Sequence, residues 1–290
     1  MNSFRSSQLW LMLMWLVGLV LVAARMEIPA VSLPVFLALD VIYVGVVLAL
    51  LRRLDAGANR IATALAVSGP GLFAFVGFTG PPTADSPDLM MFNTAALLAV
   101  ALWLLLVATT LVTRYGAVVA GPGLVLMVVG TGVYVVNLLA RVAVVLSGAS
   151  GQQASVEDTA WVAYEYLRGL DGAPDFVTYL LVWLDLLQLG YVATVYVCFA
   201  GIARVLRMRG EVSQRMGRGV ERMGYALAAV IVLGVTLAIV LPRELDLVPA
   251  WAAFVASIPF MTTLLPSVLG ASMLATRSDV RTSMSLRRAG

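Results

Sequence analysis

The sequence predicts an all-α, polytopic transmembrane helical bundle of about eight spans, with the N and C termini in the cytoplasm. Of its 290 residues, 61% are hydrophobic and only 12% are charged, whereas a soluble domain carries about a quarter charged residues. The apolar residues form long continuous runs, and about 20 apolar residues suffice to cross a bilayer. We therefore expect one transmembrane helical domain over residues 1–290, in a multi-pass protein of a bacterial plasma (inner) membrane.

The first four expected spans are residues 8–24, 32–51, 61–78 and 91–112. The first is interpreted as a retained span because it is longer than the apolar core of a signal peptide and another span follows it. The third contains Gly69-Pro70-Gly71, which predicts a kink because proline removes a helical hydrogen bond.

The remaining four expected spans are residues 118–146, 176–206, 223–241 and 248–275. Gly121-Pro122-Gly123 is expected to break the start of the fifth span, and Pro259 and Pro266 to interrupt the eighth. The sixth is longer than a bilayer requires, so it is expected to tilt or to project into the cytoplasm.

Arginine placement sets the predicted orientation. The sequence has 19 basic residues, all of them arginine, and they gather after alternate spans. Short loops rich in basic residues stay on the cytoplasmic side, so eight spans place all four groups inside. The groups are Arg52, Arg53 and Arg60; Arg114; Arg204, Arg207, Arg209, Arg215, Arg218 and Arg222; and Arg277, Arg281, Arg287 and Arg288.

The outer loop at 147–174 is predicted to contain a short amphipathic helix. Ser155-Val156-Glu157-Asp158 is typical of a capping box, and Trp161, Tyr164 and Leu167 share one helix face by their spacing. Aromatic side chains favour the membrane interface, so an interfacial anchor is one interpretation. A lid over a cavity that opens outward is the other.

Composition excludes several chemistries. The chain has no histidine and no lysine, which rules out a retinal Schiff base, histidine ligation of haem or zinc, and a Ser-His pair. Cys198 is the single cysteine, so an intrachain disulfide is impossible. We expect no cofactor, no metal and no nucleic-acid partner, since topology explains the arginines better.

Four ionisable or amide side chains fall at membrane depth: Asp40, Asn137, Arg141 and Asp185. Such groups are costly in lipid, so they usually face the protein interior and have partners. Arg141 needs an anion, and either Asp185 or Asp40 would serve. The carboxyl group left without a cation would favour its protonated form and could hold a proton.

Polar and aromatic residues accompany these four. Tyr134, Asn137 and Arg141 form an i, i+3, i+7 stripe. Gln188 shares a face with Asp185, and the rest of the expected substrate-binding set is aromatic: Tyr43, Tyr179, Trp183 and Tyr191. A functional pocket is one interpretation, and a polar cluster that only fixes helix packing is the alternative.

These side chains suit an enzyme that acts on a lipophilic substrate. A protonated Asp185 or Asp40 could deliver a proton to an apolar molecule, with the second carboxylate holding or reloading it. Tyrosine and tryptophan ring faces would stabilise the resulting carbocation.

The segment Trp183-Leu184-Asp185-Leu186-Leu187-Gln188, Asp40 and the small multi-span size together resemble the small integral-membrane terpene cyclases. Members of that family cyclise prenylated substrates, often linked to indoles or polyketides. The resemblance implies that Asp185 and Asp40 are the catalytic acids, in an isomerase or lyase reaction. Because the sequence lacks the aspartate-rich magnesium motif of ionising cyclases, protonation rather than diphosphate loss is expected.

Two other functions also fit the sequence. Helices broken by glycine and proline, with acids at membrane depth, also suit a transporter or exporter of a small molecule or ion, with its polar site in the outer half of the membrane. A non-catalytic membrane subunit or sensor would use Arg141 and Asp185 for packing alone. For the enzyme, the partners would be membrane lipids and a lipophilic small molecule.

Overall fold

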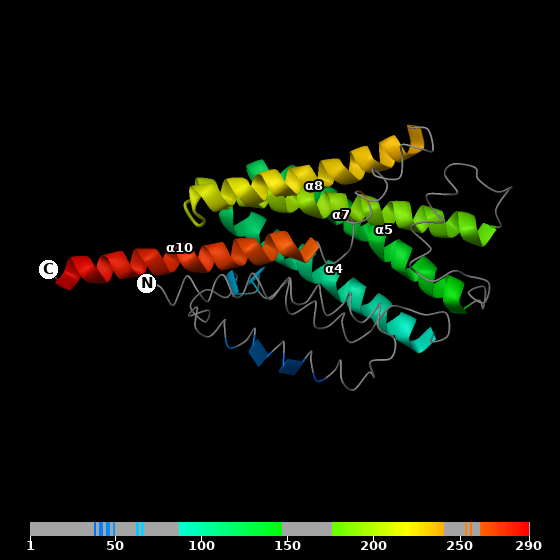
Figure 1. Ribbon diagram of the computed structural model, residues 1–290, viewed down its shortest axis with the longest axis horizontal. Helices are drawn as coiled ribbons and strands as arrows, with labels where there is room; N and C mark the ends of the chain where they lie inside the picture. Colours follow the sequence, from blue (N-terminus) through cyan, green and yellow to red (C-terminus); the bar gives the residue numbers. More distant parts are fainter. Residues whose placement is uncertain are drawn as a thin grey trace.

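A computed structural model gives the fold of the chain (Figure 1). It describes residues 87–146, 176–240 and 262–289, with isolated positions within 38–49, 62–66 and 253–256. The described helices are α4 (Pro87–Tyr115), α5 (Ala117–Leu146), α7 (Phe176–Met208), α8 (Gln214–Val240) and α10 (Leu264–Ala289). The all-helical prediction is confirmed for these residues.

Four of these helices are long and apolar enough to cross a membrane. The qualifying segments are Leu97–Tyr115, Val118–Ala143, Leu186–Met208 and Gln214–Leu237. They fit a membrane-embedded protein. The count of eight spans, the side of the termini and the kind of membrane stay predictions. The first span, the kink at residues 69–71 and the helix in the outer loop lie outside the described residues.

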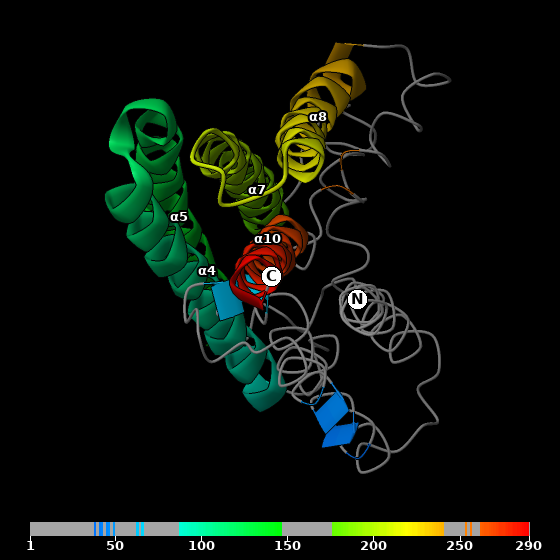
Figure 2. The same cartoon turned by 90° about the vertical axis from the view of Figure 1, so that its left-hand side faces the viewer.

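α7 lies at the centre of the described bundle. It packs between α5 and α8, α4 packs along α5, and α10 contacts both α7 and α8 (Figure 2). Glycines allow the closest of these approaches. A Cβ atom on Gly123 would lie 3.0 Å from Cys198 Cα, and one on Gly224 would lie 2.9 Å from the Tyr196 carbonyl oxygen. Substituents at these two positions would push α5 or α8 away from α7.

The connection between α4 and α5 is a single residue, Gly116. Its φ is 126°, a conformation that L side chains rarely adopt and glycine adopts without strain. Its N–H still donates to the Val112 carbonyl oxygen at 3.0 Å. The two helices therefore form a very tight antiparallel hairpin.

The connection between α7 and α8 consists of a C-terminal cap on α7 and an N-terminal cap on α8. Gly210 has a φ of 70°, and the N–H of Glu211 reaches back to the Leu206 carbonyl oxygen at 2.9 Å, as in a Schellman motif. Ser213 then caps α8, because its Oγ accepts a hydrogen bond from the Met216 N–H at 3.3 Å. This cap explains why α8 begins at Gln214. The helix therefore includes an arginine-rich stretch that precedes the predicted span at 223–241.

Two other helix boundaries correct the sequence predictions. The expected break at Gly121-Pro122-Gly123 is wrong, because α5 runs through Pro122. Pro122 is the sixth residue of α5, so it leaves the Val118 carbonyl oxygen without its helical donor but does not end the helix. α10 begins at Leu264 with Pro266 in its first turn, where the missing N–H has no helical acceptor, and it continues well past residue 275.

Arginine-rich ends of the described helices lie together. Figure 1 shows the α4–α5 turn, the α7–α8 turn and the C-terminal end of α10 at the left-hand end of the bundle. The two turns also meet: the Arg209 Nη2 atom lies 3.4 Å from where a Cβ on Gly116 would stand. Three of the four arginine groups thus share one end, as the positive-inside pattern requires.

Candidate functional site

The contact between α5 and α7 joins part of the predicted site. Asn137 is fully buried, and its Nδ2 donates a hydrogen bond to the backbone carbonyl of Leu184. Its Oδ1 accepts a hydrogen bond from Arg141 Nε at 3.0 Å. The Leu184 carbonyl belongs to the peptide unit that leads into Asp185. Asn137, Arg141 and the backbone of Asp185 therefore lie at the same level of the bundle.

The stripe on α5 explains this arrangement. Tyr134, Asn137 and Arg141 follow one another at i, i+3 and i+7, so they project from one face, and Tyr134 and Asn137 are buried there. One turn before Tyr134, Gly130 lies so close to the Thr194 side chain on α7 that an added Cβ would collide with it. Close approach at Gly130 brings α7 within reach of the short Asn137 amide.

Tyr134 and Tyr191 stack between the two helices. Their ring centroids are 4.3 Å apart and the rings are within 2° of parallel. Both hydroxyl groups are buried, and neither has a hydrogen-bond partner among the residues that the structure describes. Arg141 follows Tyr134 by two turns on the same face of α5. Two phenols, an amide and a guanidinium thus form one polar cluster, which we call the α5–α7 cluster.

Two other predicted residues lie on α7 near the Leu184 carbonyl in sequence, with different exposure. Gln188 is partly buried and lies one turn after Leu184, whose carbonyl Asn137 binds. Trp183 is 53% exposed, so much of its indole lies on the outer surface of α7 rather than between the helices.

The roles of the remaining predicted residues stay predictions. Asp185 and Tyr179 belong to α7, but their side chains are outside the described part of the structure. Asp40 and Tyr43 also lie outside the described residues. Which acid pairs with Arg141 is therefore still a prediction.

Sequence reasoning missed two contacts in this region, those of Thr194 and Ala256. The Thr194 Oγ1 donates to the Tyr191 carbonyl oxygen at 2.7 Å, which holds this side chain against α5. Tyr196 donates to the backbone carbonyl of Ala256 at 2.6 Å and so fastens α7 to a segment distant in sequence. A buried tyrosine in a long apolar run was the available signal, but its acceptor is a backbone oxygen that no sequence pattern marks.

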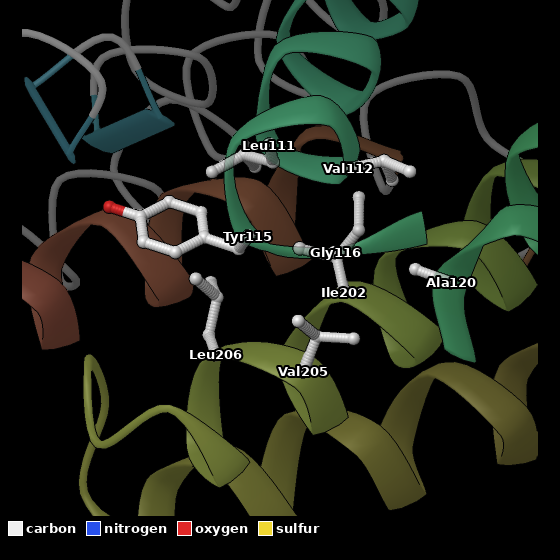
Figure 3. Close-up of a pocket in the computed structure, with 8 residues that line it drawn as sticks. All are labelled: Leu111, Val112, Tyr115, Gly116, Ala120, Ile202, Val205 and Leu206. Atoms are coloured by element: carbon white, nitrogen blue, oxygen red, sulfur yellow. The ribbon is translucent and has the colours of Figure 1, made fainter. Parts of the chain in front are cut away.

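A small apolar gap lies at the arginine-rich end (Figure 3). It has about 150 Å³ of empty space and is too narrow to hold a water molecule. It is lined by Leu111, Val112, Tyr115, Gly116, Ala120, Ile202, Val205 and Leu206. Apolar lining and narrowness make it a packing gap at the α4–α5 turn, away from the α5–α7 cluster.

Metal-binding side chains do not gather in the described parts of the chain, where no three histidine, cysteine, aspartate or glutamate residues approach one another closely enough to hold an ion. No protein-family model, curated protein or solved structure matches the chain. The function is accordingly inferred from the chemistry of the α5–α7 cluster.

Proposed function

We propose that this protein is an integral-membrane enzyme that acts on a lipophilic substrate at the α5–α7 cluster. Its specific reaction would be the protonation-initiated cyclisation of a prenylated, terpene-type substrate. One observation supports this most: the Tyr134 and Tyr191 hydroxyls are both buried without a described partner. Buried polar groups nearly always have a partner, so a pair without one suits a site where a substrate supplies it.

The proposed chemistry combines the α5–α7 cluster with the two predicted acids. The carboxylic acid of Asp185 or Asp40 transfers its proton to a prenyl double bond, forming a C–H bond and leaving a tertiary cation. A second double bond attacks that cation and closes the ring. Loss of a proton to the carboxylate restores the acid, so the product is an isomer of the substrate.

The tyrosines and Arg141 have separate roles in this scheme. Each stacked ring has one face turned away from the other ring, and that face would stabilise the cation. Each hydroxyl could donate a hydrogen bond to a carbonyl or hydroxyl group at the polar end of the substrate. Arg141, oriented by Asn137, would keep one carboxylate ionised while the other carries the proton.

Conversion of candidate substrates tests the proposal. Purified protein is incubated with prenylated indoles and polyketides, and products of unchanged mass but altered retention are measured by mass spectrometry. Asp185→Asn or Asp40→Asn should abolish conversion. Tyr134→Phe and Tyr191→Phe should each lower it by about tenfold, the effect of one lost hydrogen bond of about 1.4 kcal/mol.

Tyr115→Phe is the matched control, because Tyr115 also carries a buried hydroxyl without a described partner but is the last residue of α4, at the α4–α5 turn and away from the α5–α7 cluster. It should convert substrate at the wild-type rate. The acid-catalysis proposal fails if Asp185→Asn and Asp40→Asn both leave conversion unchanged.

A second candidate function rests on a different observation. Asn137 uses both ends of its amide, one toward α7 and one toward Arg141, which is also what a purely structural link between helices requires. A non-catalytic subunit would contain such a link. In that case no candidate substrate would raise the melting temperature of the protein, and substitutions in the cluster would change stability alone.

A further inference from the structure

Two opposite faces of α8 differ in character along its whole length. The inner face, against the bundle, is buried and mostly small: Gly217, Val220, Gly224, Ala228, Ile231 and Gly234. The outer face is exposed and follows the same i, i+3/i+4 spacing: Arg215, Arg218, Arg222, Tyr225, Ala229, Val232 and Leu233. The outer face therefore changes from arginine to apolar residues along one continuous line.

Positive charge on this outer face is not neutralised by the neighbouring acid. Glu221 turns toward α7, where its Oε2 binds Arg207 Nη2 at 2.9 Å. Arg207 also donates to Gln214 at 3.3 Å. Within the described residues no carboxylate pairs with Arg215, Arg218 or Arg222. These three guanidinium groups, which we call the α8 arginine stripe, project along about 10 Å of the helix surface.

Helix length places the stripe at the depth of lipid headgroups. From Arg222 to the end of α8 at Val240 there are 18 residues, which rise about 27 Å, close to the thickness of the hydrocarbon core. Tyr225, 45% exposed, follows one turn inside, and Val232 and Leu233, each 58% exposed, lie deeper. The outer face of α8 thus has charges at the interface, an aromatic ring beneath them and aliphatic side chains in the acyl region.

We propose that the α8 arginine stripe and the apolar residues below it bind an anionic phospholipid. The headgroup phosphate would lie among the three guanidinium groups, which suit phosphate because of their forked donors. The acyl chains would follow Tyr225 and Leu233. Arginines whose only role was to determine topology could lie anywhere in the cytoplasmic loop, in any arrangement. Here they are aligned on one helical face that continues into the lipid-facing surface.

Lipid titration of the purified full-length protein tests this proposal. Native mass spectrometry would compare phosphatidylglycerol with phosphatidylcholine of the same acyl chains. Wild type should retain phosphatidylglycerol about tenfold more strongly. The variant Arg215→Gln/Arg218→Gln/Arg222→Gln should lose most of that preference, with phosphatidylcholine binding unchanged. Equal binding of the two lipids by wild type would overturn the proposal.

Two control variants separate the stripe from general charge and from misfolding. Replacing the same three arginines with lysine keeps the charge and membrane insertion, and it should restore at least half of the preference. Replacing Arg277, Arg281 and Arg287 at the end of α10 with glutamine removes an equal charge elsewhere and should leave the preference intact. The assignment to the α8 arginine stripe is wrong if the α10 variant loses as much of the phosphatidylglycerol preference as the α8 glutamine variant. It is also wrong if the lysine variant shows no more of that preference than the glutamine variant.

Discussion

Replacing Asn137 with alanine should destabilise the protein by about 2–5 kcal/mol. The change removes the hydrogen bond to the Leu184 carbonyl. Interhelical hydrogen bonds of this kind in membranes contribute about 0.6–1.7 kcal/mol to stability. It also removes the acceptor for Arg141 Nε at 3.0 Å, and a hydrogen bond to a charged group contributes about 1.5–3 kcal/mol. The two losses arise from the same fully buried side chain.

Cys198 provides the assay. It is the only cysteine in the chain and is completely buried on α7, so a thiol-reactive dye reports the opening of the α5–α7 interface. Unfolding would be followed in mixed micelles as denaturant or temperature is increased. Thr131→Ala is the matched control, because among the described residues the buried Thr131 hydroxyl bonds only to Met127 on its own helix, at 2.8 Å. It should cost less than about 1 kcal/mol.

A double-mutant cycle isolates the contact between Asn137 and Arg141. Asn137→Ala and Arg141→Met, singly and together, should show a coupling free energy of about 1–2 kcal/mol. The reasoning is refuted if the two single effects add to within about 0.3 kcal/mol, or if Asn137→Ala is no more destabilising than Thr131→Ala.

Three further predictions use the same dye assay. Gly116→Ala should lower the free energy of unfolding by about 1–2 kcal/mol, because a side chain is strained at φ 126°. Gly132→Ala, where an added Cβ meets open space, should be neutral or stabilise by up to about 1 kcal/mol. Equal effects of the two substitutions would show that the turn is not strained. Gly270→Ala should cost about 1–3 kcal/mol or more, since its Cβ would meet backbone, including the Ala62 carbonyl oxygen at 2.5 Å. A variant that melts like wild type would contradict that close approach. Arg207→Met should lower the free energy of unfolding by about 1–3 kcal/mol, because the mostly buried Glu221 carboxylate loses its 2.9 Å partner and keeps only the half-exposed Arg204, at 4.0 Å, among the described residues. The loss should largely disappear when Glu221→Gln is added, and persistence of the full loss would contradict the ion-pair explanation.

Apolar runs were enough to predict where the described helices lie, but not where they end. The start of α8 depends on the Ser213 cap and the turn at Gly210, local features that override the polar character of the arginines that follow. Similarly, Pro122 predicts a break by its identity alone, yet α5 continues through it.

The candidate site was predictable in its α5 half for a physical reason. Amide and guanidinium groups at membrane depth must be satisfied by other protein groups, and the spacing of Asn137 and Arg141 puts them on one face. The spacing could not predict the hydrogen-bond partner of Asn137. That partner is a backbone carbonyl, and every residue of α7 has a backbone carbonyl. The stacking of Tyr134 on Tyr191 likewise depends on the relative height of two helices, which no local pattern encodes.

The single-residue connection at Gly116 also constrains how the two helices can sit in a membrane. Because Ala117 follows Tyr115 after one residue, the end of α4 and the start of α5 cannot lie at different depths. In a bilayer the pair would therefore share one boundary at this turn, with the backbone polar groups satisfied within each helix. Arg114, in the last turn of α4, would hold that boundary at the aqueous interface.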